Sequence, residues 1–212
     1  IINWRYDMNI PYVTIDNFFE TPTLVREYAL SQEFYKGDRG NWPGLRTNFM
    51  HVINPELHHI VASKIIKYLP NFNSFKTLEM TFQIIGEEYG FGWAHVDNPA
   101  FNIGGVVYLT PNPPKETGTL IFDYKDYDET FAQMSFNRFD QDVNRNPNSK
   151  IEGVDDHRKK HNSFFTPNLI CENRFNRCTF YDSRQYHCAQ NFFGTTKENS
   201  RLTLVFFGQA VA

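Results

Sequence analysis

Cysteine is scarce in this sequence. The three cysteines, Cys171, Cys178 and Cys188, include no C-x-x-C pair and leave one thiol over in any pairing scheme. An odd count without paired spacing argues against the disulfide framework of a small secreted protein. We therefore expect reduced thiols and a cytoplasmic protein.

Long apolar runs and an excess of basic charge are also missing. No apolar run approaches the roughly 20 residues that a membrane helix needs, and the opening IINWRYDMNI lacks the basic-then-apolar pattern of a signal peptide. The net charge of -3 gives no basic surplus for bulk binding to nucleic acid. We expect neither a membrane nor a nucleic acid as partner. The sequence starts at Ile1 without a methionine, so we expect a trimmed chain or a fragment.

Aromatic residues, by contrast, are abundant. They make up 17% of the 212 residues, 21 of them phenylalanine, and hydrophobic residues make up 41%. Bulky aromatic side chains favour strands and fill the space between sheets. A chain of this length is most simply one domain with a sizeable core. The composition predicts a single, mainly β domain over residues 1–212.

Residues 1–77 read as a support region with two helices. PYVTIDNFF is strand-like, and the next segment has the helix-start signals Thr21 and Pro22. A second helix has Asn54 as N-cap and Pro55 at its first position. Its apolar stripe consists of Leu57, Ile60, Val61, Ile65 and Leu69. We expect both helices to pack outside a barrel wall.

The loop KGDRGNWPGLRTN separates these two helices. It carries Trp42 and Arg46, which could contact a substrate. Gly and Pro punctuation makes turn residues without a functional role the simpler interpretation.

From Leu78 onward, short β-type runs surround four chemically distinctive residues. The runs are LEMTFQIIG, NIGGVVYLT, GTLIFD, RCTFYD and RLTLVFFGQ. His95 and Asp97 lie in GWAHVDNP, His187 in RQYHC and Arg201 in NSRLTLVFF. Side chains two apart on a strand share a face, so His95 and Asp97 can bind one metal ion while His187 arrives from a distant strand. Two imidazoles and one carboxylate on one face of an octahedron are typical of non-haem Fe(II) oxygenases.

The order of these motifs resembles the 2-oxoglutarate- and Fe(II)-dependent dioxygenases, and within them the prolyl-4-hydroxylase-like branch. The likeness covers Leu78 to Gln209 and is carried by HVDNP, YLT, TGTLIF, FNRCTFYDSRQYH and SRLTLVFF. It implies a mainly β fold whose core is a double-stranded β-helix, or jelly roll, over residues 78–209 with the N-terminal helices at its flank.

The resemblance also implies roles for individual residues. His95, Asp97 and His187 would bind Fe(II), Arg201 would pair with the C5 carboxylate of 2-oxoglutarate, and Tyr108 would donate a hydrogen bond to that carboxylate. Fe(II), 2-oxoglutarate as co-substrate and O2 are the implied cofactors, with succinate and CO2 released as a C–H bond is hydroxylated. Asp97 favours hydroxylation, because halogenating relatives leave its position open for chloride.

Two features depart from the family pattern. The segment CAQNFFGTTKENS makes the spacing from His187 to Arg201 longer than in many relatives. A second tyrosine that some relatives carry before the His-x-Asp motif is absent, and Gln83 and Ile85 occupy that stretch.

Several alternatives stay open for substrate and activity. A peptidyl proline is the first expectation for the substrate, followed by a free amino acid or small metabolite. A cupin-type metalloenzyme that uses O2 without 2-oxoglutarate and a non-catalytic jelly-roll binding protein are the rival functions. Arg201 favours the dioxygenase over the cupin-type enzyme, which has no need of a buried cation there.

Residues 123–175 are too long for an ordinary connection between barrel strands, and we expect an insertion that acts as a lid or a partner surface and shapes the choice of substrate. Within it, VDDHRKKH places His157 and His161 four apart beside two aspartates, but its polarity favours a solvated loop over a metal site. Trp93 shares the face of His95 and either lines the pocket or packs the barrel. Cys188 would point away from His187 and is not a ligand.

Overall fold

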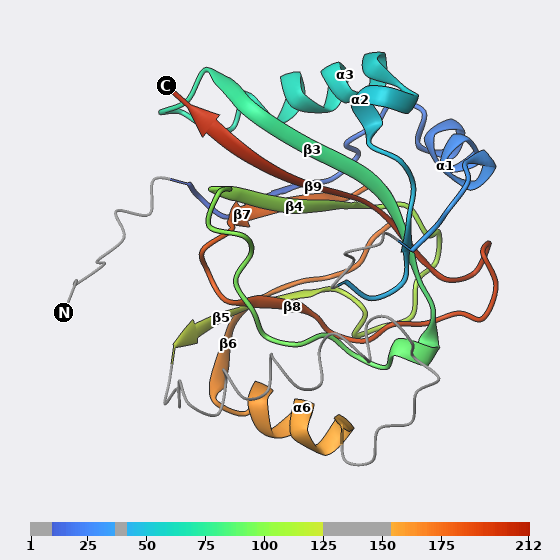
Figure 1. The fold of residues 1–212 in the computed structure, drawn as a ribbon, viewed down its shortest axis with the longest axis vertical. Helices are drawn as coiled ribbons and strands as arrows, with labels where there is room; N and C mark the ends of the chain where they lie inside the picture. The colour runs from blue at the N-terminus through green and yellow to red at the C-terminus, as the bar shows by residue number, and fades with distance from the viewer. Residues whose placement is uncertain (1–9, 37–41, 125–153) are drawn as a thin grey trace.

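Two antiparallel sheets lie face to face, with helices outside both of them (Figure 1). The computed structural model describes residues 10–36, 42–124 and 154–212. Helices α1 (Pro22–Ser31), α2 (Met50–Ile53) and α3 (Pro55–Ile66) cover the outer face of the larger sheet, and α6 (Val154–Asn162) lies outside the smaller one. The predicted mainly β, jelly-roll architecture with flanking N-terminal helices is confirmed.

The larger sheet has six strands in the order β1-β7-β4-β9-β3-β2. Its strands are β1 (Val13–Ile15), β2 (Leu45–Arg46), β3 (Ser74–Ile85), β4 (Ile103–Tyr108), β7 (Cys178–Asp182) and β9 (Arg201–Val211). The last strand of the chain therefore lies between β3 and β4, inside the sheet. All the longer β-type runs of the sequence are strands, whereas the short edge strand β2 lies in a stretch expected to be a loop.

The smaller sheet has the order β6-β5-β8, formed by β5 (Thr119–Tyr124), β6 (Phe165–Cys171) and β8 (His187–Ala189). β6 pairs with β5 along its length, so the end of the expected insertion 123–175 belongs to the sheet itself. The part of that insertion from 125 to 153 lies outside the described residues. The lid role stays a prediction.

The helices begin and pack largely as their sequence signals indicate. The side chain of Asn54 accepts a hydrogen bond from the Leu57 amide at 2.9 Å, which caps α3. Leu57, Val61 and Ile65 are buried, but Ile60 is 40% exposed and does not belong to the packed stripe. The one-turn helix α2 had no distinct sequence signal.

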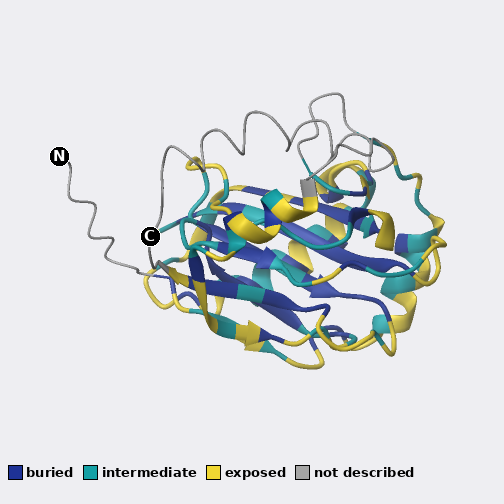
Figure 2. Cartoon of the chain, turned by 90° about the horizontal axis from the view of Figure 1, so that it is seen from below, coloured by how far each residue is buried: buried dark blue, intermediate teal, exposed yellow. Residues whose placement is uncertain are grey.

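Alternation along the strands separates an apolar face from a polar one. On β9, Leu202, Leu204 and Phe206 join the main hydrophobic core beneath the helices. Arg201 and Thr203 point to the opposite face, between the two sheets. Figure 2 shows the buried residues concentrated along the strands, with exposed residues toward the periphery. The helix-side core stabilises the large sheet and leaves its inner face free for polar chemistry.

Among the residues that the structure describes, no helix combines the length and apolar character needed to cross a membrane.

Candidate metal centre

His95, Asp97 and His187 converge between the two sheets. One ligand atom from each lies within 4.8 Å of the others. Nε2 of His95 is 3.7 Å from Oδ1 of Asp97, and Nε2 of His187 is 3.5 Å from Oδ2 of the same carboxylate. These separations leave room for an ion at the centre of the three donors. The structure thus brings together the three residues that the sequence predicted as ligands.

Backbone pairing to β8 places the His-x-Asp motif. The amide of His95 donates to the carbonyl of His187 at 3.0 Å, and the amide of His187 donates back at 2.9 Å. The Asp97 amide donates to the carbonyl of Ser183 at 2.9 Å. His95 therefore occupies an isolated bridge and Asp97 lies outside the named strands, which differs from the continuous strand expected. The motif reaches the centre because its backbone is anchored to β8 and to the turn before it.

Both imidazoles are oriented by backbone carbonyls. Nδ1 of His95 lies 2.7 Å from the carbonyl oxygen of Trp93, and Nδ1 of His187 lies 2.9 Å from that of Gln185. A proton held on Nδ1 by each carbonyl leaves Nε2 with its lone pair facing the centre. This is the outer hydrogen bond that metal-binding histidines typically make.

Asp97 carries the observation most telling for a metal. Its Oδ2 is buried without a hydrogen-bond partner among the described residues. A Cβ at Gly104 would come within 2.6 Å of this oxygen, so the absent side chain makes room for the carboxylate. A buried carboxylate oxygen without a donor is costly unless a cation compensates it. The donor set of two neutral imidazoles and one carboxylate fits Fe(II) or a similar divalent ion.

Charge and burial favour the ligand forms of His95 and Asp97. Burial alone would lower the pKa of His187, but the neighbouring Asp97 carboxylate raises it. Desolvation by the surrounding protein lowers the pKa of His95 to about 4, and the charge of neighbouring His187 is the second cause. Burial alone would raise the pKa of Asp97, but His187, His95 and Arg46 together lower it. The Asp97 side chain is only 8% exposed, whereas that of His95 is 45% exposed. The centre is therefore open toward solvent on the His95 side.

A buried cation and a buried phenol lie together elsewhere on the inner face. The Arg201 side chain begins β9, and its Cζ is 5.4 Å from the ring centroid of Tyr108. Nε of Arg201 donates to the carbonyl of Thr117 at 3.4 Å, and the Tyr108 hydroxyl is 2.7 Å from Oγ1 of Thr119. No carboxylate in the described part of the chain lies within 4.0 Å of Arg201. Such a guanidinium can pair with an anion from outside the protein.

Tyr181 was missed by sequence reasoning. Its ring centroid is 4.6 Å from that of His187, and burial raises its pKa well above the ordinary value, with the charge of Asp97 adding to the effect. The alternation of CTFYD would have placed Thr179 and Tyr181 on one face of β7. That signal alone could not show that the face adjoins the centre.

The segment VDDHRKKH is a helix, not the solvated loop expected. His161 is buried, and its Nε2 lies 2.8 Å from the carbonyl oxygen of Ala94. Trp93 packs on this helix, with ring centroids 5.4 Å from His161 and 5.9 Å from His157. Trp93 therefore packs against α6. His157 and His161 belong to no candidate metal-binding group among the described residues.

Cys188 points away from the centre as predicted. It is buried in a small apolar cluster with Ala94, Phe122 and Phe165. The orientation follows from strand alternation, since His187 faces inward.

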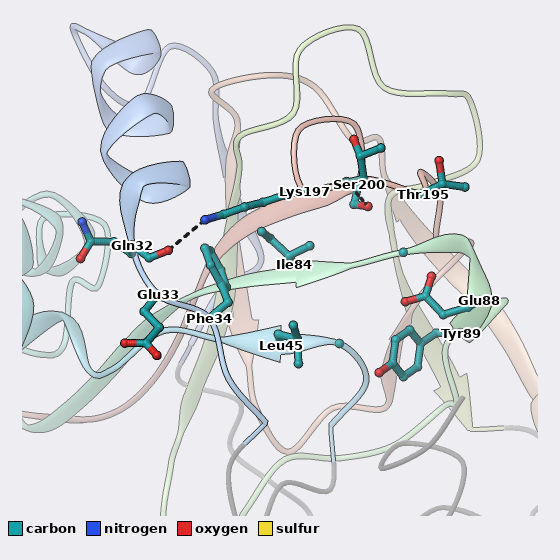
Figure 3. A pocket seen from close by; sticks show the side chains of 13 residues that line it. Gln32, Glu33, Phe34, Leu45, Ile84, Glu88, Tyr89, Thr195, Lys197 and Ser200 are labelled. Carbon is teal, nitrogen blue, oxygen red and sulfur yellow. Dashed lines mark hydrogen bonds between the residues drawn. The ribbon is translucent and has the colours of Figure 1, made fainter. Parts of the chain in front are cut away.

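A pocket of about 580 Å³ lies on the other face of the β2–β3 edge (Figure 3). It is lined by residues that include Glu33, Leu45, Ile84 and Lys197, and the Lys197 ammonium donates to the carbonyl of Gln32 at 2.9 Å. None of its lining residues is a candidate metal ligand. The candidate metal centre and this pocket are therefore two separate sites.

Solved structures with the same fold include prolyl hydroxylases and a protein with 2-oxoglutarate bound. HygX from Streptomyces hygroscopicus, with nickel and 2-oxoglutarate bound, is 10% identical, with 95% of this chain and 84% of that chain covered and a TM-score of 0.57. A prolyl hydroxylase from Trichoplax adhaerens, in complex with a peptide of hypoxia inducible factor, is 14% identical, with 93% and 83% covered and a TM-score of 0.51. A prolyl-4-hydroxylase from Pseudomonas putida is 11% identical, with 95% and 93% covered and a TM-score of 0.51.

These likenesses confirm, at the level of the fold, the resemblance to the 2-oxoglutarate- and Fe(II)-dependent dioxygenases and their prolyl-4-hydroxylase-like branch. No curated protein matches the chain in sequence. A family model described as a family of unknown function, DUF6445, matches residues 5–207. The chain therefore belongs to the DUF6445 family.

Proposed function

We propose that this protein is an Fe(II)- and 2-oxoglutarate-dependent dioxygenase that hydroxylates a substrate C–H bond. The observation that carries the proposal is the convergence of His95, Asp97 and His187, together with an Asp97 Oδ2 that has no hydrogen-bond partner among the described residues. A hydrogen-bonded structural carboxylate would have donors on both oxygens. A metal ion accounts for the unpartnered oxygen and for the orientation of both imidazoles.

The bound metal and 2-oxoglutarate supply the oxygen chemistry, and the chain supplies ligation, orientation and a shaped cavity. His95, Asp97 and His187 would hold the ion, and three protein ligands would leave it coordination sites for 2-oxoglutarate and O2. The reaction balances as substrate, O2 and 2-oxoglutarate giving hydroxylated substrate, succinate and CO2.

Arg201 is proposed to bind the C5 carboxylate of 2-oxoglutarate, with Tyr108 beside it. The guanidinium is buried, close to the phenol, and has no carboxylate partner among the described residues. Its planar fork suits two carboxylate oxygens at once. The assignment predicts that Arg201 affects co-substrate affinity and leaves metal affinity intact.

The substrate is proposed to be a peptidyl proline or a small molecule such as a free amino acid. The Trichoplax adhaerens hydroxylase was solved with a peptide, and HygX was also solved with hygromycin B, so the fold accommodates both kinds of ligand. The three cysteines are free and buried, which supports a reducing compartment such as the cytoplasm.

The test is an anaerobic titration of the metal-free protein with Fe(II) and then 2-oxoglutarate, followed by visible absorption. A charge-transfer band that requires both additions, and that disappears in His187→Ala, is the expected result. His59→Ala is the matched control, because His59 is exposed on α3 and far in sequence from the motif. This variant keeps the band.

Other outcomes select the rival functions. Iron binding without a band, whether or not 2-oxoglutarate is present, would favour a cupin-type metalloenzyme. Absence of iron binding would leave a non-catalytic jelly-roll protein. A band of full strength in His187→Ala would contradict the ligand assignment.

A further inference from the structure

Four polar side chains form one row across the inner face of the large sheet. Arg46 on β2 pairs with Gln83 on β3, Gln83 pairs with Thr203 on β9, and Thr203 pairs with Tyr108 on β4. Directly paired residues of antiparallel strands point to the same face. Leu45 and Ile84, one position along, line the pocket on the other face of these strands (Figure 3). Arg46 therefore points toward the interior between the sheets.

Among the described residues, the Arg46 side chain has aromatic neighbours but no hydrogen-bond acceptor. Its Cζ is 4.3 Å from the ring centroid of Trp42 and 5.7 Å from that of Phe207. Its Nε is buried without a hydrogen-bond partner, and within the described ranges no carboxylate lies within 4.0 Å of the guanidinium. Burial lowers the pKa of Arg46 to about 10, so the group stays cationic at neutral pH. A structural arginine at this depth would have its donors satisfied.

The guanidinium lies toward the metal centre. The Arg46 guanidinium packs on the ring of Phe207, and Phe207 pairs with Gly104 on the neighbouring strand. The Asp97 carboxylate occupies the space next to Gly104. The charge of Asp97 also acts on Arg46, and that of Arg46 acts on Asp97. Arg46 and Arg201 are thus two separate cations on one inner face, each without an acidic partner in the described part of the chain.

We propose that Arg46 is the anion subsite for the substrate and binds a carboxylate of a small acid through its planar fork. The inference rests on the proposed function, in which Arg201 already serves the co-substrate. Trp42 and Phe207 pack against the guanidinium and leave its donor edge for oxygens in the same plane. Trp42 offers a further donor, since its Nε1 is buried without a partner.

The subsite selects between the two substrate classes. A proline inside a peptide has no carboxylate of its own to present to Arg46. A free amino acid or another small acid has such a carboxylate. Its binding to Arg46 would hold the other carbons of the substrate at a fixed distance from the metal. The free acid is therefore the favoured substrate class.

The test uses a panel of free amino acids and small monocarboxylic acids, each paired with its primary amide. The full chain, loaded anaerobically with Fe(II) and 2-oxoglutarate, is screened by unfolding temperature and then by calorimetry, and the screen is repeated without iron and co-substrate. We expect at least one acid to bind while its amide does not. Arg46→Gln should weaken that acid at least ten-fold and leave 2-oxoglutarate affinity within about two-fold, because charged hydrogen bonds are lost only from the subsite.

Two variants accompany Arg46→Gln. Arg174→Gln makes the same change at an exposed arginine that pairs with Glu172, and it should bind the acid as the unchanged protein does. Arg46→Lys keeps the charge but loses the fork, and it should give an intermediate affinity. Unfolding temperatures without ligands check that each variant folds.

The proposal is overturned if no acid binds, if amides bind as well as acids, or if Arg46→Gln binds acids normally. Equal loss of 2-oxoglutarate affinity in Arg46→Gln would assign Arg46 to the co-substrate instead. If inorganic phosphate binds and none of the acids does, the carboxylate proposal is overturned and the ligand class is a phosphoryl group. The proposed function is tested by a different measurement. If the unchanged protein gives no charge-transfer band, the proposed function fails, whatever the acids do.

Discussion

At the scale of single residues, the centre depends on a side chain that is absent. Gly104 lies under the Asp97 carboxylate, and a methyl group there would approach Oδ2 to 2.6 Å. The contact is with the end of a side chain, so the carboxylate can rotate away without breaking the sheet. We expect Gly104→Ala to fold and to bind Fe(II) or Mn(II) about ten-fold or more weakly, as changes around metal ligands commonly do. Calorimetric metal titration measures this, and unchanged affinity would show that Asp97 is not held against Gly104 in solution.

Arg201 tests the other end of the site. Arg201→Gln removes the cation proposed to bind the C5 carboxylate, so the half-saturating 2-oxoglutarate concentration should rise by tens of fold. Metal affinity should stay the same, because no ligand atom is changed. The measurement is the charge-transfer titration, with Arg174→Gln as the control. Equal loss of metal and co-substrate binding would make Arg201 a structural residue.

At the scale of elements, α6 fixes the segment that leads to the metal ligands. Asn162 at its end accepts a hydrogen bond from the Ala94 amide and donates one to the Gly92 carbonyl, both at 2.9 Å. Arg158 donates to the carbonyls of Tyr89 and Phe91 at 2.8 and 3.0 Å. The helix therefore acts as a support for the backbone on which His95 is mounted.

The support predicts a coupled loss of stability and metal binding. Asn162→Ala should lower the free energy of unfolding by about 1–3 kcal/mol, because it leaves two backbone groups without their partners. Metal affinity should fall several-fold as the segment before His95 loosens. Lys159→Ala changes an exposed residue of the same helix and should affect neither quantity. A destabilised Asn162→Ala with unchanged metal affinity would separate α6 from the centre.

Local patterns predicted most elements, but not their contacts. Strand alternation, the proline signal of α1 and the cap of α3 are local, so they could be read directly. β2 is two residues long and depends on its pairing with β3 and on a bridge from Arg46 to Tyr35, and α6 is polar and buries only selected side chains. What β2 and α6 contribute depends on tertiary contacts, which the periodicity of the sequence does not reveal.

The candidate ligands were predictable because the three residue types, in that order along the chain, carry their own chemistry. Gly104, Tyr181 and Arg46 were not, because each matters only through a partner that is distant in sequence. For Arg46, the sequence favoured a turn residue without a role. Its stacking on Trp42 and its unpartnered Nε became visible only with the barrel interior in place.

At the scale of the whole molecule, an ion pair joins segments that are far apart in the sequence. Arg177 donates to both carboxylate oxygens of Asp16, at 2.6 and 2.9 Å, next to the pairing of β1 with β7. The Arg177 hydrogen bond lowers the pKa of Asp16 despite partial burial. A carboxyl group with a depressed pKa stabilises the fold above its unfolded pKa and loses that contribution as the pH falls through the folded value.

Asp16→Asn should therefore lower the free energy of unfolding at pH 7 by about 0.2–1 kcal/mol, the range for exposed pairs. The difference from the unchanged protein should shrink as the pH falls below about 4, where the carboxyl begins to be protonated. Urea unfolding at pH 7, 5 and 3.5 measures it, with exposed Glu27→Gln as the control. A difference that grows toward acid pH would contradict the assigned sign.

The position of β9 in the larger sheet has a consequence for synthesis on the ribosome. Residues Arg201–Val211 form an inner strand, held by β3 on one side and β4 on the other. Until they leave the exit tunnel, the earlier strands have no neighbour in the middle of the sheet and expose the edges that should face β9. We expect the nascent chain to stay unfolded and dependent on chaperones until residues Arg201–Val211 emerge, so that the candidate site, which includes Arg201, and the larger sheet are completed in the same event.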